Sequence, residues 1–290
     1  MTWKGIILAG GSGTRLYPST LSISKQLIPI YDKPMIFYSL SILMYAEIRE
    51  ILIITTPRDL KSFKSLLGNG KDLGVSIKYK IQENPKGLPD AFIVGENFIG
   101  KENVCLVLGD NFFYGQGFKE YLLNAKARLK GATVFGYKVN NPSEFGIIEV
   151  NKNGSVISIK EKPKNPRSNM AIPGLYFFDN QSIKKSKTLK PSGRGELEIT
   201  ALLKSYLNEN QLVMDEFGRG FAWLDTGSHS SLLEASHFVE MIEKRQGLKI
   251  ACLEEIAWRN GWITKKNLLD SAKKYSKSSY GEYLIKIANE

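Results

Sequence analysis

The sequence predicts an α/β fold in which helices flank a largely parallel, mixed β-sheet. Short apolar runs alternate with helix-like patterns through the first half of the chain, an order typical of parallel sheets. Several strand-like runs then follow one another before helical patterns return, which indicates an insertion and a helical C-terminal cap. With 290 residues, 42% of them hydrophobic, the chain can bury a sizeable core. We therefore expect one continuous domain over residues 1–290, with parts at about 1–110, 111–230 and 231–290.

The first half should open with a buried strand that runs straight into a glycine-rich loop. Apolar runs and alternation predict strands, and apolar residues at helical spacing predict helices. The expected strands are 5–10, 50–56, 75–83 and 103–111, and the expected helices are 34–48, 59–68 and 88–99. In such sheets ligands bind at the carboxyl ends of the strands. The glycine loop and Asp110 both follow strands, so they should meet at one edge of the sheet.

The second half is expected to be richer in strands. The predicted strands lie at 132–139, within 145–163, and at 174–179 and 221–227, and the predicted helices at 196–210 and 231–247. The Asn153-Gly154 pair is a hairpin signal, so 145–163 should fold as two paired strands. The tail beyond Gly247 should be helical and basic.

The composition is strongly basic, with 40 Lys and Arg against 29 Asp and Glu, a net charge of +11. Such a balance raises the possibility of nucleic-acid binding. The charge is spread along the chain, however, and its Lys-rich patches at 184–190 and 265–277 match no known nucleic-acid-binding signature. A solvated basic surface is therefore the preferred interpretation, and a small polyanionic substrate explains part of the charge equally well. We expect no nucleic-acid partner.

Few residues suit thiol chemistry or a zinc site. Cys105 and Cys252 stand among apolar neighbours, like buried structural thiols, and the two histidines, His229 and His237, are too few for a His-rich zinc site. Any catalytic metal should therefore be a hard cation held by carboxylates. No run approaches roughly 18 consecutive apolar residues, and the N-terminus lacks signal-peptide features. We expect a cytoplasmic protein with no membrane partner.

The loop "GGSGTR" after the first strand is the first candidate binding segment. It matches neither the dinucleotide fingerprint, because Leu16 stands at the third glycine position, nor the Walker pattern. Glycines let backbone N–H groups approach phosphate oxygens, and Arg15 and Lys25 could neutralise a polyphosphate. A tight turn with two surface cations is the alternative, but the presence of both cations favours phosphate.

Two carboxylates stand where buried strands end, Asp110 in "LVLGDN" and Asp225 in "FAWLDTG". An acidic group in such a place is costly unless it is paired or bound to a cation. Two aspartates from separate strand ends suit Mg²⁺, which takes one or two carboxylates together with substrate phosphates. Both segments are also common turn sequences, so a pair of turn-forming aspartates is the alternative.

Glu161 and Lys162 in "KEKP" form a third candidate, at the end of a strand. Adjacent strand residues point to opposite faces, so only one of the two should face a site unless the strand bulges. A surface ion pair is the alternative. The acidic segment "GELEIT" at 195–200 reads as the start of a helix, where acidic residues suit the helix dipole.

With these residues in view, "ILAGGSGTRLYPST" and "SKQLIPIYDKPMIFY" resemble the signature of the sugar nucleotidyltransferases. Further segments are similar to the glucose-1-phosphate thymidylyltransferase family, from the start of the chain to near its end. They are "LVLGDNFFYG", "EFGIIEV", "IKEKP", "GLYFFD", "GRGELEIT", "GRGFAWLDTGSHSSLLEAS" and "IEKRQGLKIACLEEIAWRNGWI". The resemblance implies a Rossmann-like, GT-A-like fold with a nucleotide-binding half, a sugar-phosphate-binding half and a helical C-terminal cap. Hexapeptide repeats, which would indicate relatives with a β-helix extension, are absent from the sequence.

The resemblance implies transfer of a thymidylyl group from dTTP to α-D-glucose 1-phosphate, with Mg²⁺ as cofactor and dTDP-glucose and pyrophosphate as products. This reaction is the first step of dTDP-L-rhamnose and deoxysugar biosynthesis. The resemblance implies three catalytic residues, Arg15, Lys25 and Lys162. It also implies two metal ligands, Asp110 and Asp225. The implied nucleotide contacts are Gly10, Gly11, Gly13, Thr14, Arg15, Lys25, Gln82, Gly87 and Asp110. The implied sugar-phosphate contacts are Asn111, Gly146, Glu161, Lys162, Ile172 and Tyr176.

The resemblance further implies a homotetramer with a second nucleotide site, at which dTDP-L-rhamnose acts as a feedback inhibitor. The residues that match this regulatory site are Gly115, Arg219, Lys249, Glu255 and Arg259.

The chain departs from the family pattern at two places. It has "GLPDA" at 87–91, where Gly-Leu-Ala-Gln-Ala is common, so Asp90 adds a negative charge near the nucleotide. Phe145 stands where Tyr is usual, which loses a hydroxyl and keeps the ring. A UTP-using or other hexose-1-phosphate nucleotidyltransferase is an alternative activity. A non-catalytic nucleotide-binding homologue is an alternative class, supported only by the net charge.

Overall fold

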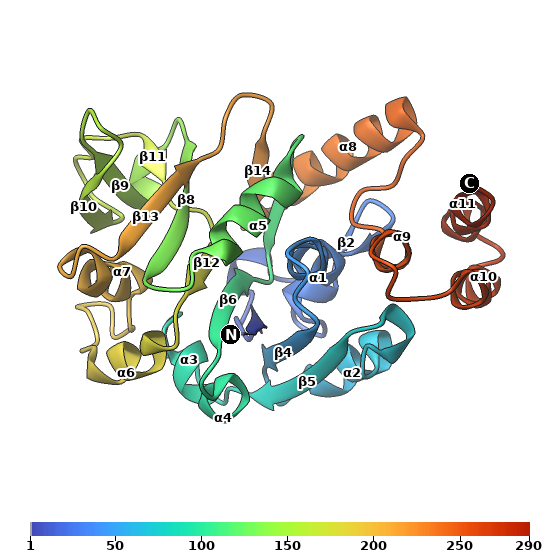
Figure 1. The fold of residues 1–290 in the computed structure, drawn as a ribbon, viewed down its shortest axis with the longest axis horizontal. Helices are drawn as coiled ribbons and strands as arrows, with labels where there is room; N and C mark the ends of the chain where they lie inside the picture. Colours follow the sequence, from blue (N-terminus) through green and yellow to red (C-terminus); the bar gives the residue numbers. More distant parts are fainter. Residues whose placement is uncertain (1) are drawn as a thin grey trace.

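The computed structural model describes residues 2–290, and its N-terminal half is built on four parallel strands. They are β1 (Trp3–Ala9), β4 (Glu50–Thr55), β5 (Ser76–Ile81) and β6 (Asn103–Leu108). β1 lies between β4 and β6 and pairs in parallel with both (Figure 1). The carboxyl ends of these strands therefore lie at one edge, which brings the glycine loop and Asp110 together as predicted.

The second half extends the same sheet with a different strand direction. β12 pairs antiparallel with both β6 and β8, and the hairpin of β9 and β10 forms the far end. These strands are β8 (Ala132–Lys138), β9 (Gly146–Val150), β10 (Val156–Glu161), β11 (Met170–Ala171), β12 (Leu175–Phe178) and β13 (Leu212–Glu216). The result is a ten-stranded mixed sheet, parallel in its first half and mostly antiparallel in its second. The predicted α/β class is confirmed.

Two short strand pairs complete the β-structure. β7 (Asn111–Tyr114) pairs antiparallel with β14 (Ala222–Asp225), and this register sets Asp225 opposite Asn111. Asp225 is thus the last residue of its strand and lies beside the end of β6, more than 100 residues away in the chain. β2 (Pro29–Ile30) and β3 (Lys33–Pro34) form a small hairpin before the first long helix.

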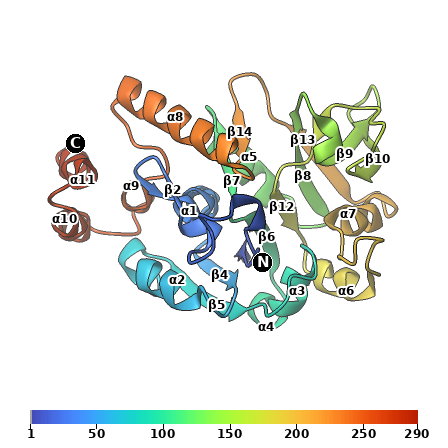
Figure 2. The ribbon, with the colours of Figure 1, turned by 180° about the vertical axis from the view of Figure 1, so that it is seen from behind.

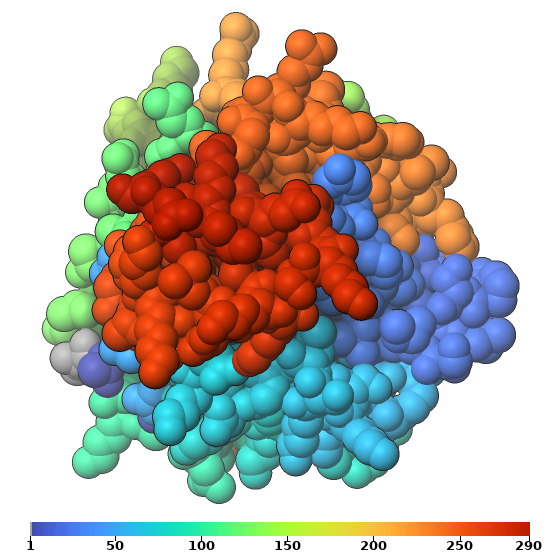
Figure 3. All heavy atoms as spheres, turned by 90° about the vertical axis from the view of Figure 1, so that its right-hand side faces the viewer, coloured from blue at the N-terminus to red at the C-terminus, as the bar shows by residue number. Residues whose placement is uncertain are grey.

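Helices cover both faces of the sheet (Figures 1 and 2). They are α1 (Met35–Tyr45), α2 (Leu60–Leu67), α3 (Asp90–Val94), α4 (Glu96–Ile99), α5 (Phe118–Ala127), α6 (Gln181–Thr188), α7 (Ile199–Leu207), α8 (His229–Gln246), α9 (Leu253–Arg259), α10 (Lys265–Lys274) and α11 (Ser279–Ala288). Short 3₁₀ turns are η1 (Thr14–Leu16), η2 (Lys25–Leu27), η3 (Lys71–Leu73) and η4 (Pro142–Glu144). α10 and α11 form much of the surface at one side of the molecule (Figure 3).

Side-chain alternation along the central strands divides the core into two layers. Ile7 packs with α1 and the C-terminal helices on one face, while Ile6 packs with α3, α4 and α7 on the other. Both neighbours are fully buried, because helices cover the sheet on each side. Cys105 and Cys252 are buried free thiols, as the sequence predicts.

Two predicted helices differ from the structure. The stretch 88–99 is two short helices separated by Gly95. The acidic segment 195–200 was expected to begin a helix, but α7 begins only at Ile199, with Glu198 in extended conformation before it. Glu196 and Glu198 therefore lie in a loop and are free to face a cavity. Among the described residues, no helix has the length and apolar character needed to cross a bilayer.

Candidate active site

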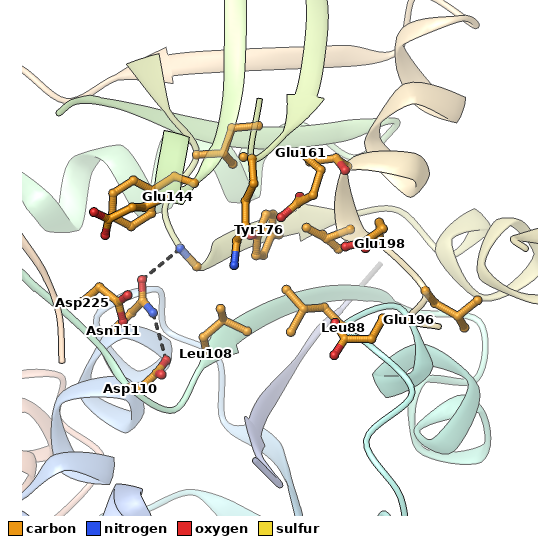
Figure 4. A pocket seen from close by; sticks show the side chains of 18 of the residues that line it. Leu88, Leu108, Asp110, Asn111, Glu144, Glu161, Tyr176, Glu196, Glu198 and Asp225 are labelled. Carbon is orange, nitrogen blue, oxygen red and sulfur yellow. Dashed lines mark hydrogen bonds between the residues drawn. The ribbon is translucent and has the colours of Figure 1, made fainter. Parts of the chain in front are cut away.

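A cavity of about 560 Å³ opens at the carboxyl edge of β6, between the two halves of the sheet. In Figure 4, Asp110, Asn111 and Asp225 lie at one end and Glu161, Glu196 and Glu198 toward the other, with Tyr176 between them. A second hollow of about 210 Å³ lies along the glycine loop and shares Arg15 and Asp110 with the first. The two hollows together form a continuous site.

Most of the predicted site residues line these two hollows. The first is lined by Arg15, Asp110, Asn111, Gly146, Glu161, Lys162, Ile172, Tyr176 and Asp225. The second is lined by Gly11, Gly13, Thr14, Arg15, Lys25 and Asp110. Gly10, Gln82 and Gly87 border neither directly, although all three lie next to residues of the site.

Lys25 and Asp110 form an ion pair at the centre of the site, with Nζ 2.7 Å from Oδ2. Lys25 is buried and lies in η2, just before the β2–β3 hairpin. Burial alone would raise the pKa of Asp110, but the Lys25 ammonium and a hydrogen bond from Asn111 outweigh it and hold this pKa below its ordinary value. Asp110 is therefore a carboxylate at neutral pH.

Asp225, at the end of β14, lines the same cavity as Asp110, but its pKa is shifted in the opposite direction. Burial and the charge of Asp110 raise the pKa of Asp225, against the lowering effects of Lys25, Arg15 and Lys162. Two acidic groups that repel one another at a partly closed edge form a donor set that suits a hard cation. Residues 2–290 contain no group of three or more His, Cys, Asp or Glu side chains that could hold a metal ion. The two carboxylates fit an ion that takes one or two protein carboxylates and fills its other positions with phosphate or water.

Asn111 holds this end of the cavity in place. Its Nδ2 donates to Asp110 Oδ1 at 3.0 Å, while its Oδ1 accepts from Trp223 Nε1 at 2.6 Å and from the Gly174 backbone N–H at 3.0 Å. The amide is buried and these bonds fix its orientation. Asn111 thereby ties the end of β6 to β14.

Glu161 and Lys162 both line the cavity, because the regular strand alternation that would turn them to opposite faces stops at Glu161. β10 ends at Glu161, and Lys162 adopts a positive φ of 40°. Its backbone N–H donates to Phe145 O at 3.1 Å. This left-handed conformation breaks the strand alternation at a small cost in strain, of the kind that recurs at functional sites.

Arg194 is a further cation of the site that the sequence analysis missed. It pairs with Glu198 at 2.7 Å and Glu161 at 3.3 Å and lines the large cavity. Other lining residues not foreseen are Leu88, Leu108, Glu144, Gly174, Glu196, Leu197, Ile199, Thr200 and Trp223. The signal for Arg194 was the segment "GRGELEIT", which carries part of the family resemblance and in which glycines flank the arginine, but only its part 195–200 was interpreted, as the start of a helix.

Gly227 is a second residue that sequence reasoning missed. A Cβ built on it would lie 3.0 Å from Arg15 Nη1, so its lack of a side chain makes room for the guanidinium. The turn after β14 therefore places Asp225 and Arg15 close together. The signal was the "DTG" sequence, which we treated only as a possible turn.

Gln82 and Gly87 lie on the other side of the glycine loop. A Cβ built on Gly10 would lie 3.2 Å from Gln82 Oε1, so the amide borders the loop. Gly87 has a φ of +102°, and a Cβ on it would lie 2.1 Å from Leu197 O. Only glycine permits this approach, which joins the 86–88 segment to the loop that carries Arg194.

Four of the five predicted regulatory residues line a separate cavity of about 620 Å³: Gly115, Lys249, Glu255 and Arg259. This cavity lies between β7, α5 and the segment that leads into α9. Glu255 accepts hydrogen bonds from Arg259 at 2.8 Å and from Tyr283 at 2.6 Å. Arg219 is exposed in the loop before β14 and is not among the lining residues.

Comparison with known proteins agrees with this geometry. The family model described as nucleotidyl transferase matches residues 4–241. A glucose-1-phosphate thymidylyltransferase of Neisseria meningitidis is 58% identical over 98% of this chain and 99% of its own length.

Solved structures agree as well. A Bacillus anthracis protein provisionally named glucose-1-phosphate thymidylyltransferase, crystallised with sucrose, is 38% identical over 82% of this chain and 95% of its own, with a TM-score of 0.76. A UDP-glucose pyrophosphorylase complexed with UDP-glucose is 26% identical over 83% of this chain and 100% of its own, with a TM-score of 0.74. The chain therefore belongs to the nucleotidyl transferase family and, within it, to the glucose-1-phosphate thymidylyltransferases.

Proposed function

We propose that this enzyme transfers a thymidylyl group from dTTP to α-D-glucose 1-phosphate and releases pyrophosphate, giving dTDP-glucose. The observation that carries the proposal is the convergence of Arg15, Lys25 and Lys162 with two carboxylates on one continuous site. Identity also favours dTTP over UTP, because the Neisseria thymidylyltransferase is 58% identical and the UDP-glucose enzyme 26%. The first part of the chain holds the nucleotide, the second holds the sugar phosphate, and the C-terminal helices form a cap.

Lys162 and Arg194 are the cations on the sugar side of the cavity. We assign Lys162 the task of holding the phosphate of glucose 1-phosphate, so that one of its oxygens can attack the α-phosphorus of dTTP. Glu161, Gly146, Ile172, Tyr176 and Asn111 surround the sugar. The step is a displacement at phosphorus, in which positioning and charge neutralisation supply most of the catalysis.

Arg15 and Lys25 act on the nucleotide side. The backbone of Gly10, Gly11, Gly13 and Thr14 approaches the triphosphate, and Arg15 stabilises the charge that develops on the leaving pyrophosphate. Lys25 remains paired with Asp110 and keeps that carboxylate ionised. Gln82 and Gly87 contact the base.

Asp110 and Asp225 are the residues that would hold Mg²⁺. When bound, this ion would neutralise phosphate oxygens at the reacting centre. Its charge would also offset the burial and the Asp110 repulsion that raise the pKa of Asp225, so both aspartates would be ionised together.

The second cavity is our candidate for a regulatory nucleotide-sugar site, with dTDP-L-rhamnose as the feedback inhibitor and a homotetramer as the assembly. Support comes from the four matching residues that line it, which include the cations Lys249 and Arg259. The enzyme would then act in the cytoplasm, at the first step of dTDP-L-rhamnose biosynthesis.

A pyrophosphate-release panel with four nucleotides and several hexose 1-phosphates tests the proposal. We expect dTTP with glucose 1-phosphate and Mg²⁺ to give the highest kcat/KM. A higher value with UTP, or with another sugar phosphate, would replace the assigned substrates. Absence of turnover with every pair would instead favour a nucleotide-binding protein without catalysis.

A further inference from the structure

We propose that Asp90 is a positioning residue that fixes the Gln82 amide with its carbonyl oxygen toward the nucleotide base, so that the site selects a base with an N3–H donor. The proposal rests on the proposed function and deepens it, because it concerns how the base of the triphosphate is chosen. It assigns a task to a residue at which this chain departs from the family pattern.

The contact between the two side chains is short and buried. Gln82 Nε2 donates to Asp90 Oδ2 at 2.6 Å, and the two residues are only 5% and 7% exposed. A carboxylate accepts hydrogen bonds and offers none, so only the NH₂ end of the glutamine can face it. The orientation of the amide therefore follows from the chemistry of its partner.

The other end of the amide is directed toward the nucleotide loop. Gln82 Oε1 would lie 3.2 Å from a Cβ on Gly10, the first glycine after β1. Glycine at this position leaves the carbonyl oxygen unobstructed. The Gln82 backbone N–H donates to Thr55 O at 2.9 Å, which fixes the residue at the end of β5.

The partner carboxylate is itself held in place. Asp90 opens α3, directly after Pro89, and its backbone N–H donates to Gly87 O at 3.3 Å. The next two residues, Ala91 and Phe92, are fully buried in the core. The carboxylate therefore has a fixed position beside the base-contacting segment. An amide at 90, which is common in the family pattern, could meet Gln82 with either end and would leave both glutamine orientations available.

The fixed orientation has a consequence for base choice. Thymine and uracil carry a hydrogen on N3, which a carbonyl oxygen can accept. Cytosine has a lone pair on N3, so the Gln82 oxygen would face a second acceptor and leave a buried polar atom unpaired. Sites of this kind reject the mismatched analogue strongly, because the unpaired group loses its hydrogen bond to water.

The test compares dTTP with 5-methyl-dCTP, which has the same shape and differs at N3 and at the exocyclic group on C4. The readout is the ratio of the two kcat/KM values with glucose 1-phosphate. Asp90→Asn is isosteric and lets the Gln82 amide turn over, so it should lower the ratio by about 10-fold or more. The change should reside in KM for the nucleotide, while kcat with dTTP stays within about twofold.

A reciprocal exchange and a matched control sharpen the design. In the double variant Gln82→Glu/Asp90→Asn, the asparagine NH₂ faces the glutamate, and residue 82 again offers only an acceptor to the base. This variant should recover preference for dTTP over 5-methyl-dCTP relative to Asp90→Asn. The control is Asp179→Asn, because Asp179 is equally buried, accepts from Tyr206 at 2.7 Å and lines neither hollow of the site. It should lower stability and leave the ratio unchanged.

The outcomes distinguish failure of the proposed function from failure of the positioning role of Asp90. A wild-type enzyme that does not use dTTP would overturn the proposed function itself. An active wild type whose ratio is unaffected by Asp90→Asn would overturn the positioning role alone. Asp90→Ala removes the anchor without adding an amide, so it replaces Asp90→Asn if that variant does not fold and should also lose selectivity.

Discussion

Lys25 and Asp110 form an ion pair that joins the segment after the glycine loop to the end of the central strand β6, with Nζ 2.7 Å from Oδ2. Lys25 is 6% exposed. A buried ammonium that loses its partner keeps its desolvation cost, so Asp110 supports the fold in addition to the role that we propose for it in the reaction. Asp225 differs, because burial and the neighbouring Asp110 charge raise its pKa. The two aspartates should therefore respond in opposite ways to the same substitution.

Asp110→Asn and Asp225→Asn should both lose most turnover while shifting stability in opposite directions. Asp110→Asn removes the hydrogen-bonded carboxylate of the buried Lys25 and should lower the free energy of unfolding by about 3 kcal/mol. Asp225→Asn removes a carboxylate whose charged form is disfavoured in the folded state, so its melting temperature in Mg²⁺-free buffer should rise at neutral pH. Differential scanning calorimetry and the pyrophosphate-release assay measure the two effects.

The pH dependence of stability tests whether Asp225→Asn stabilises the protein for the electrostatic reason given. A carboxyl group with a raised folded-state pKa contributes stability below its unfolded-state pKa of 3.8 and loses it as pH rises through the folded value. The gain from Asp225→Asn should therefore appear as pH rises above 3.8 and level off once Asp225 is ionised in the folded state. Equal destabilisation by both substitutions would contradict the electrostatic contrast.

Arg15→Ala should lower kcat by about 10²–10³-fold, because the guanidinium stabilises charge that appears only as pyrophosphate leaves. Binding of dTDP-glucose, which has no γ-phosphate, should weaken much less. Arg15→Lys should recover only part of the rate, since an ammonium cannot bridge two phosphate oxygens as a guanidinium does. Steady-state kinetics and calorimetric titration separate the two quantities, and an unchanged kcat in Arg15→Ala would exclude the assigned role.

Periodicity predicted much of this fold, because a buried strand and a covered helix leave clear patterns. The strand at β1, the α2 helix ending at Gly68 and the α8 helix ending at Gly247 all lie close to where the sequence predicted them. Periodicity did not predict the backbone conformation within short segments. Gly95 divides 88–99 into two helices, and Glu198 stays extended before α7.

In the site, too, some features could be predicted from local sequence patterns, whereas others depend on contacts that form only in the folded protein. The positions of Asp110, just beyond β6, and of Asp225, at the end of β14, were predictable because strand-like runs end there in the sequence. The positive φ of Lys162 could not be predicted, and neither could the ion pair of Arg194 with Glu161, because it joins segments far apart in the chain. The contact between Gln82 and Asp90 likewise depends on how α3 packs beside β5.

Glu254→Gln should make the protein more stable at alkaline pH. Burial raises the pKa of Glu254, although hydrogen bonds from Tyr280 and Tyr275 lower it in part. The charged form therefore costs stability as pH rises above the unfolded-state value of 4.5. Gln can still accept the Tyr280 hydrogen bond, which is 2.6 Å in the parent chain.

Melting temperatures measured from about pH 4 upward test this effect: the variant should gain on the wild type as pH rises above 4.5 and keep that gain once Glu254 is ionised in the folded state. Glu240→Gln is the control of opposite sign, because the Lys244 ammonium lowers the pKa of Glu240 and its charged form is favoured. A constant difference between Glu254→Gln and wild type across this range would show that ionisation of Glu254 is not the cause.

Lys33→Met should be among the most destabilising single substitutions outside the apolar core. Lys33 is 2% exposed and pairs with Asp32 and, at 2.9 Å, with Glu243 of α8. Lys249 completes the cluster by pairing with the same two carboxylates. Without Lys33, two acidic groups share one cation in a site that water hardly reaches, so the free energy of unfolding should fall by about 3 kcal/mol.

The matched control is Lys274→Met, which breaks an exposed pair with Asp72 whose side chains are 60% and 72% accessible. It should cost about 0–1 kcal/mol and lose even that at high salt, because exposed pairs are screened. The effect of Lys33→Met should persist at about 1 M NaCl, where the Debye length is only about 3 Å, because the cluster is shielded from solvent. Urea denaturation at low and high salt measures both. Similar small costs for the two variants would mean that the β2–β3 hairpin is held by its apolar contacts with α8, such as those of Ile30, and not by the buried charges.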